Sequence, residues 1–221
     1  MTLMKSPIHV ILSGLLLLLP LTGQAAPEET VAVTFRVAAV AISGELDTLW
    51  LATRPGEPAV ECRLNIRSFS EAIEAKVAGG RLLFHPSREA AEASPPRPPL
   101  VTIPLAGKAA GLVLFFPDKD GYQAMRIPDG EVDFGSFVLI NTTRANLSWQ
   151  AAAAKPVVVK PGQRSVIPAP DGKPLPVKLA AELPTGGSKL IRSTTWQIDP
   201  AQREFVIVHG GPERPKFHHL V

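Results

Sequence analysis

Short runs in which apolar and polar residues alternate follow one another along most of this chain, with turn residues between them. Residues 30–37 form one such run, with Val31, Val33 and Phe35 on one side of an extended strand. Turns such as Pro161-Gly162 separate the runs. The other expected strands are 48–52, 59–67, 81–84, 111–116, 122–127, 132–142, 146–149, 157–159, 165–167, 177–179, 194–198 and 204–209. This spacing predicts an all-β protein, an antiparallel Ig-like β-sandwich, built as two small sandwich domains or one extended one.

Residues 111–116 are apolar on both faces, which suits a central strand covered from both sides. We therefore expect this segment in the core. The pair Asp120-Gly121 follows shortly after it and predicts a tight hairpin to the next strand.

The best internal boundary is the turn at Pro128-Asp129-Gly130. It divides the chain into an N-terminal β-sandwich domain, residues 26–128, and a C-terminal Ig-like β domain, residues 129–221. The chain beyond residue 25 is long enough for two small β domains or one large one.

Residues 1–25 have the pattern of a signal peptide. Lys5 precedes an apolar stretch over 10–21, and Gly23 and Ala25 are small residues suited to cleavage after Ala25. A retained membrane anchor is the competing interpretation, but the apolar stretch is shorter than the roughly 20 residues that a spanning helix needs. We expect export to the periplasm or the medium, with no transmembrane span after cleavage.

The single cysteine, Cys62, excludes a disulfide within one chain. It shares a strand face with Val60, Leu64 and Ile66, so we expect a buried thiol that packs as a small apolar side chain. The alternatives are a catalytic nucleophile and a crosslink between chains.

Three segments are expected outside the strands. Residues 69–77 contain good helix formers and predict a short helix. Residues 86–99 hold no apolar side chain larger than alanine, which predicts an exposed loop that ends in polyproline II structure. The basic end, from Arg214 to His219, is expected to be a solvated terminus.

The charge balance gives no indication of a nucleic-acid partner. The chain has 23 Lys and Arg against 20 Asp and Glu, and cleavage after Ala25 removes only Lys5 from this balance. The remaining basic residues are scattered along the chain, whereas nucleic-acid binding needs them gathered on one face.

The sequence contains none of the familiar signatures of serine hydrolases, zinc proteases or phosphate-binding loops. A metal site made of His209, His218 and His219 would place its ligands at a chain end, whereas metal ligands normally lie on rigid elements. We therefore assign no catalytic residue, no metal and no cofactor.

Three tryptophans are the candidate binding residues: Trp50, Trp149 and Trp196. Each lies in an expected strand, where an outward-facing ring can stack on a sugar or anchor a protein partner. Burial in the core is the competing interpretation for each of them.

The segment from Gly135 to Thr143, followed by Leu147-Ser148-Trp149 and by the Lys160-Pro161-Gly162-Gln163 turn, resembles a module of uncharacterised exported bacterial β-sandwich proteins. It is more distantly similar to the accessory proteins of alginate acetylation. In that module a strand that ends in Asn-x-Thr/Ser leads through a turn to a second strand. The resemblance implies an exported Ig-like domain, and it implies no activity.

We expect from these features a non-catalytic binding or structural protein of the bacterial cell envelope, with an envelope protein or a glycan as its partner. A secreted hydrolase that acts on cell-wall or glycan material is the alternative. An enzyme is expected to show a pocket with converging Asp, Glu or His side chains, and a binding protein an apolar patch or an open strand edge. A domain that donates or accepts a strand is a third possibility.

Overall fold

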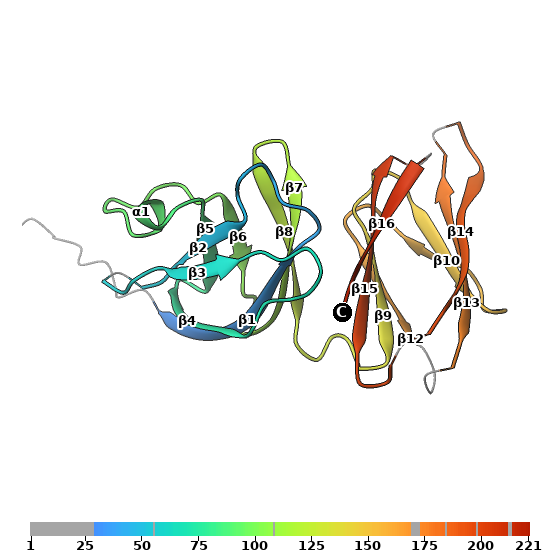
Figure 1. Ribbon diagram of the computed structural model, residues 1–221, viewed down its shortest axis with the longest axis horizontal. Helices are drawn as coiled ribbons and strands as arrows, with labels where there is room; N and C mark the ends of the chain where they lie inside the picture. Colours follow the sequence, from blue (N-terminus) through green and yellow to red (C-terminus); the bar gives the residue numbers. More distant parts are fainter. Residues whose placement is uncertain are drawn as a thin grey trace, which may run out of the picture.

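The protein consists of two β-sandwiches that lie side by side (Figure 1). The structure is a computed structural model that describes residues 29–54, 56–107, 109–168, 173–183, 185–197, 199–211 and 214–221. Nearly all regular structure in these residues is strand, so the expected all-β sandwich fold is confirmed. The expected signal peptide, residues 1–25, lies outside the described residues.

The N-terminal sandwich contains two four-stranded sheets, with strand orders β4-β1-β7-β8 and β3-β2-β5-β6. Its elements are β1 (Thr30–Ala39), β2 (Thr48–Ala52), β3 (Val60–Arg63), β4 (Ile73–Ala78), β5 (Arg81–His85), α1 (Arg88–Ala91), β6 (Val101–Pro104), β7 (Ala110–Asp118) and β8 (Gly121–Pro128). The expected hairpin after residue 116 is present, because β7 and β8 pair antiparallel with Asp118 opposite Gly121.

The C-terminal sandwich also contains two four-stranded sheets, with strand orders β12-β9-β15-β16 and β11-β10-β13-β14. Its elements are β9 (Ser136–Asn141), β10 (Leu147–Ala151), β11 (Val157–Val159), β12 (Arg164–Pro168), β13 (Leu175–Glu182), β14 (Ser188–Trp196), β15 (Arg203–Gly211) and β16 (Arg214–Leu220). The sheets of the two sandwiches share no strand, and the chain crosses between them after β8.

The two sandwiches have the same connectivity. Adding eight to each strand number of the first pair of sheets gives the strand orders of the second pair. The directions also correspond, since the one parallel pair of the N-terminal sandwich is β1 with β7, and its counterpart β9 with β15 is parallel as well. The chain therefore contains two copies of one eight-stranded unit. In each copy, one pair of neighbouring strands is parallel and the other pairs are antiparallel.

Each sandwich has its own apolar core between its two sheets. In the first, Phe84 makes edge-to-face contacts with Phe35 and Phe115, at ring-centroid distances of 6.1 and 5.1 Å. In the second, Phe137 packs against Trp196 at 4.8 Å. Period-two alternation in the strands accounts for both cores, because every second side chain points between the sheets.

A third apolar cluster joins the two sandwiches. It is formed by the second faces of the sheets β4-β1-β7-β8 and β12-β9-β15-β16, and it includes Leu114 and Ile127 from one copy and Ile207 and Leu220 from the other. This contact explains why residues 111–116 are apolar on both faces, as expected for a strand covered on both sides. The four sheets are stacked, and the two sandwiches are held together by buried side chains.

The helix expected over 69–77 is wrong. Residues 73–78 form β4, which pairs antiparallel with β1 from Ile73 opposite Phe35 to Ala78 opposite Thr30. Strand pairing and the burial of Val77 outweigh the helix propensity of the alanine, glutamate and lysine residues in this segment.

The segment 86–99 is mostly exposed, as expected, but it also contains the short helix α1 and is hydrogen-bonded to the rest of its sandwich. Ser87 caps α1 by accepting a hydrogen bond from the Ala90 backbone N–H at 3.2 Å, and Ala90 is buried. One carboxylate oxygen of Glu92 accepts from the Ala59 backbone N–H and from Arg88 Nε, both at 2.9 Å. The buried Ala90 and these hydrogen bonds hold the segment against the N-terminal sandwich, although it lacks large apolar side chains.

The basic C-terminal end is also a strand rather than a free terminus. β16 pairs with β15 along its whole length, from Arg214 opposite Gly211 to Leu220 opposite Phe205. Leu220 is fully buried in the cluster between the sandwiches, which explains why this end is docked.

Cys62 is buried, as expected. Its side chain has no exposed surface and lies in the N-terminal core opposite Leu49. Burial raises the pKa of the Cys62 thiol to about 12, so the reactive thiolate is disfavoured at neutral pH.

Candidate binding cleft

The structure separates the three tryptophans into two kinds. Trp149 and Trp196 are buried in the C-terminal core, and Trp149 Nε1 donates to Ser165 Oγ at 3.0 Å. Trp50 on β2 is partly exposed, with the Arg88 guanidinium 5.8 Å from its ring centroid. Of the three rings, Trp50 alone presents surface to a partner, and its binding role stays a prediction.

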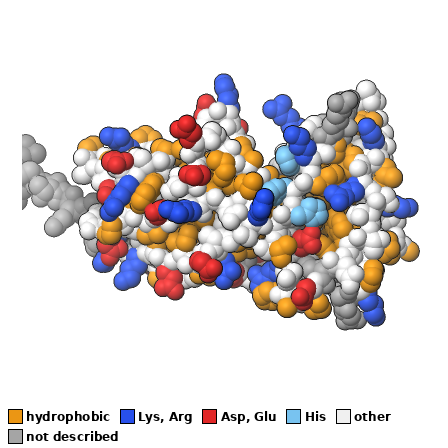
Figure 2. Space-filling view, viewed as in Figure 1, with side chains coloured by type: hydrophobic (Ala, Val, Ile, Leu, Met, Phe, Trp, Pro, Cys, Tyr) orange, Lys and Arg blue, Asp and Glu red, His pale blue; other side chains and the backbone are white. Residues whose placement is uncertain are grey.

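A cleft with a volume of about 670 Å³ lies where the two sandwiches diverge, beside the apolar cluster that joins them. Figure 2 shows a notch between the sandwiches, with histidine and basic side chains gathered on the C-terminal sandwich near it. Both copies line the cleft, each through the end of a central strand and the chain that follows its first strand. This volume lies within the range of roughly 300–1,000 Å³ that is usual for small-molecule sites.

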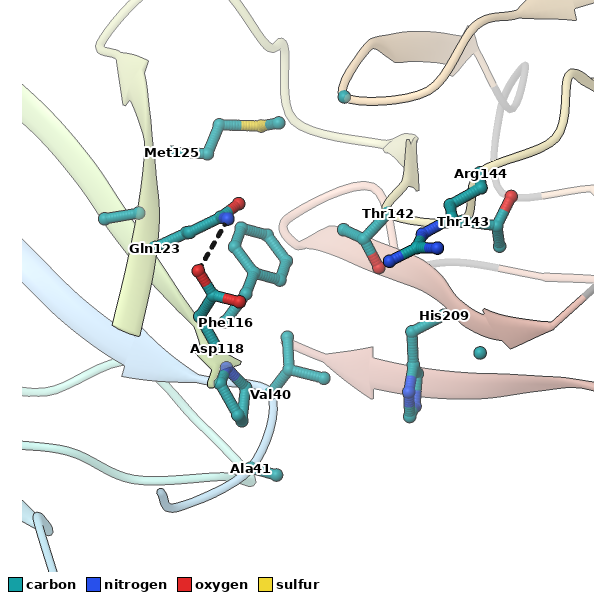
Figure 3. Close-up of a pocket in the computed structure, with 14 residues that line it drawn as sticks. Val40, Ala41, Phe116, Asp118, Gln123, Met125, Thr142, Thr143, Arg144 and His209 are labelled. Atoms are coloured by element: carbon teal, nitrogen blue, oxygen red, sulfur yellow. Dashed lines mark hydrogen bonds between the residues drawn. The ribbon is translucent and has the colours of Figure 1, made fainter. Parts of the chain in front are cut away.

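The N-terminal wall of the cleft is mainly apolar. Val40, Phe116 and Met125 line it (Figure 3). Its one charged side chain is Asp118, whose carboxylate accepts a hydrogen bond from Gln123 Nε2 at 2.8 Å. The Lys119 backbone N–H and then Gln123 lower the pKa of Asp118, which keeps it ionised at neutral pH.

The C-terminal wall is polar and carries Thr142, Thr143, Arg144 and His209. In Figure 3 the Arg144 guanidinium points into the space between the walls. Arg144 makes no hydrogen bond or ion pair with the part of the chain that the structure describes. A guanidinium in this state has all its donors available to a ligand.

The position of Arg144 depends on the Asn-x-Thr motif at the end of β9. Asn141 is fully buried, and its Nδ2 donates to the carbonyl oxygens of Ala145 and Val159, each at 2.8 Å. Its Oδ1 accepts from the Thr143 backbone N–H at 2.9 Å and from Thr143 Oγ1 at 2.8 Å. These bonds fix the turn on both sides of Arg144 and hold its backbone at the cleft.

His209 lies on β15 and lines the same C-terminal wall of the cleft. Burial is the main cause that lowers the pKa of His209, and the nearby His218 and Lys216 lower it further. The imidazole is therefore mostly neutral at pH 7, and an anion placed beside it would favour its protonated form.

The two walls are formed by equivalent positions of the two copies. The Val40 backbone N–H donates to the Phe115 carbonyl, and the Thr142 N–H donates to the Val208 carbonyl, both at 2.9 Å. Val40 therefore corresponds to Thr142, and the next residue of the central strand, Phe116, corresponds to His209. The cleft lies between matching ends of the two copies, and one copy is apolar where the other is polar.

The structure does not bring the three C-terminal histidines together on one face. Within the described ranges, no group of three or more His, Cys, Asp and Glu side chains is placed to hold a metal ion. His209 and His218 lie on one face of β15 and β16, whereas His219 lies on the other, where its Nδ1 is 2.5 Å from Glu204 Oε1. Among the described residues, no helix has the length and apolar character to cross a membrane.

Neither a family model nor a curated protein sequence matches the chain. Among the solved structures that match is the membrane pore complex of pneumolysin, with 13% sequence identity and a TM-score of 0.28. The match covers 45% of this chain and 25% of that chain, so this chain spans only a quarter of the pneumolysin chain. A likeness this low supports no conclusion about fold or function.

Arg144 and the cleft as a whole were not among the residues that the sequence marked as binding. The resemblance drew attention to Asn141 and Thr143, which hold the turn, but not to the arginine between them and the next strand. The signal that marks the site is the correspondence between the two copies, and it becomes visible only through the strand pairing.

Proposed function

We propose that this chain is an exported, non-catalytic binding protein of the bacterial cell envelope, and that its ligand occupies the cleft between the two sandwiches. Export rests on the signal-peptide pattern of residues 1–25. The binding role rests on the cleft, where two copies of one unit supply walls of different chemistry.

The observation that carries the proposal is the unpaired Arg144 at a cleft whose walls are fixed. The apolar cluster beneath the cleft holds the two sandwiches together, and the Asn141 network holds the turn next to Arg144. A charged donor on a fixed turn at a cleft is typical of a binding site, because the backbone that carries the Arg144 side chain is already ordered when the ligand arrives.

The proposal is tested by retention of envelope material on the immobilised protein. We expect Arg144→Gln to reduce retention about tenfold, since hydrogen bonds to charged groups are worth about 1.5–3 kcal/mol. Thr102→Ala, at an exposed position of β6 outside the cleft, is the control and is expected to retain the same material as the unmodified protein. Trp50→Ala tests the other candidate residue. Loss of retention in Trp50→Ala, with Arg144→Gln unchanged, would move the binding site to the outer face of the N-terminal sandwich.

A secreted hydrolase is the second candidate, and one observation favours it. Asp118 and His209 line the same cleft from opposite walls, and the pKa of each is lowered, so a carboxylate and a neutral imidazole face one space. Hydrolysis of cell-wall glycan by the purified protein, abolished in Asp118→Asn and His209→Gln, would establish the enzyme. Equal and undetectable hydrolysis by all three proteins agrees with the binding role.

A further inference from the structure

We propose that the ligand of the cleft is an organic anion in which a carboxylate is joined to an apolar group. The carboxylate would lie against the C-terminal wall, and the apolar group against the N-terminal wall. This inference rests on the proposed function, because it takes the cleft as the binding site and names the chemistry of its ligand.

The first support comes from comparing the two copies position by position. Phe116 pairs with Gln123 across β7 and β8, and the corresponding residues His209 and Lys216 pair across β15 and β16. Two residues further along these hairpins, Leu114 pairs with Met125 in the first copy and Ile207 pairs with His218 in the second. The face next to the cleft thus carries Phe, Gln and Met in one copy, and His, Lys and His in the other.

The fold does not require this difference. The N-terminal copy forms the same strands with apolar or uncharged side chains at these positions, and the C-terminal copy forms them with titratable ones. Polar and charged side chains beside an interface cost free energy when they lose water. Recognition of a ligand gives a physical reason why the C-terminal wall carries these titratable side chains and the N-terminal wall does not.

The second support is the charge around the cleft. Arg144 and Lys216 carry positive charge on the C-terminal side, and neither makes an ion pair with a described residue. His209 gains a proton more readily once an anion is near. Asp118 is the opposing charge on the N-terminal wall, where Gln123 and the Lys119 backbone N–H already bind it. An anion is therefore expected at the C-terminal wall, away from Asp118.

The third support is the apolar surface opposite. Val40, Phe116 and Met125 line the cleft and border the apolar cluster between the sandwiches. Phe116 and Met125 are only partly buried, so a ligand gains by covering them. A carboxylate joined to an apolar group satisfies both walls at once, whereas a neutral sugar leaves Arg144 without a partner.

Fatty acids and the ends of polypeptides share this chemistry, and calorimetric titration separates them. The probes are decanoate, decanol, an apolar tetrapeptide with a free C-terminal carboxylate, and the same tetrapeptide as its C-terminal amide. We expect at least one acid to bind and its neutral counterpart to bind about tenfold more weakly. Preference for decanoate indicates an acyl ligand, and preference for the free-acid peptide indicates a polypeptide end.

Two variants connect the binding to the named residues. Arg144→Gln is expected to weaken the acid about tenfold and to leave the neutral probe unchanged. His209→Phe, which places the residue of the first copy in the second, is expected to abolish the strengthening of acid binding between pH 7.5 and pH 6. Thr102→Ala, at an exposed position of β6 outside the cleft, is expected to bind all probes as the unmodified protein does.

The inference is overturned if acid and neutral probes bind equally, or if neither variant changes acid binding. Its failure is distinguishable from failure of the proposed function by Ala41→Trp, which fills the cleft with an indole. Loss of envelope retention in Ala41→Trp, without any acid preference, leaves the cleft as the site and rejects the carboxylate. Full retention in Ala41→Trp rejects the cleft itself.

Discussion

At the scale of single residues, the same side chains serve the fold and prepare the site. Asn141 satisfies four hydrogen bonds inside the C-terminal sandwich, and in doing so it fixes the turn that carries Arg144. His218 is different, because its Nε2 is buried without a hydrogen-bond partner among the described residues. Met125 occupies the corresponding position of the first copy, so the partly buried imidazole of His218 is not needed for the strand pairing.

His218 makes the stability of the protein depend on pH. Burial is the main cause that lowers the pKa of His218 below its ordinary value of 6.5, and the charge of His219 lowers it too, while a hydrogen bond with the Ile66 backbone raises it. Below pH 6.5 the unfolded chain binds a proton that the folded chain still excludes, so stability falls as the pH decreases. His209 and His85 have lowered pKa values as well and add to the same trend.

We expect His218→Met to reduce the loss of stability between pH 7.5 and pH 5.5, because it removes one of these three imidazoles. Urea denaturation at several pH values between these limits measures the change. Met125→Leu is the control at the corresponding position of the first copy, and it is expected to keep the pH dependence of the unmodified protein. An equally steep loss of stability in His218→Met would contradict the assignment.

At the scale of elements, the alternation of apolar residues predicted most strands, because the burial of every second side chain is recorded directly in the sequence. The alternation failed to predict elements whose structure depends on contacts with a segment far away in the sequence. β4 has the composition of a helix, but β1 lies beside it and takes up its backbone hydrogen bonds. α1 was missed because its buried residue is an alanine, and its anchor is a carboxylate that reaches the backbone of Ala59.

The Glu92 carboxylate is expected to control how accessible the segment 86–99 is to protease. Glu92→Ala removes the bonds to Ala59 N–H and Arg88 Nε, and exposed segments without such ties are cut first. Limited trypsin digestion is expected to cut the variant after Arg88 several-fold faster than the unmodified protein. Equal rates in the two proteins would show that the carboxylate does not hold the segment.

At the scale of the whole molecule, the chain is two copies of one unit joined through matching sheets. The duplication was not visible in the sequence, because equivalent positions of the two copies are buried alike but carry different residue types. Leu51 and Trp149 are both buried opposite the third strand of their copies, and Phe116 and His209 both lie two residues before the end of a central strand. The cleft could not be predicted for the same reason, since its walls come from residues about a hundred positions apart.

The apolar cluster between the copies is expected to make them unfold together. Leu114→Ala and Ile207→Ala, at corresponding positions, each remove buried methyl groups from this cluster and are expected to cost about 2–5 kcal/mol. Calorimetry of the unmodified protein is expected to show one cooperative transition, and each variant a lower melting temperature. Two separate transitions in the unmodified protein would mean that the interface contributes little.

The central claim, that the ligand binds between the copies, is tested most directly by crosslinking from the cleft. Ala41 is exposed and lines the cleft, and Thr102 is exposed on β6 in the other sheet of the N-terminal sandwich. A photoactivatable residue in place of Ala41 is expected to capture envelope material that decanoate or the free-acid peptide displaces, and the same residue in place of Thr102 is expected to capture none. Equal capture at the two positions, or capture at position 102 alone, would contradict the claim that the cleft is the binding site.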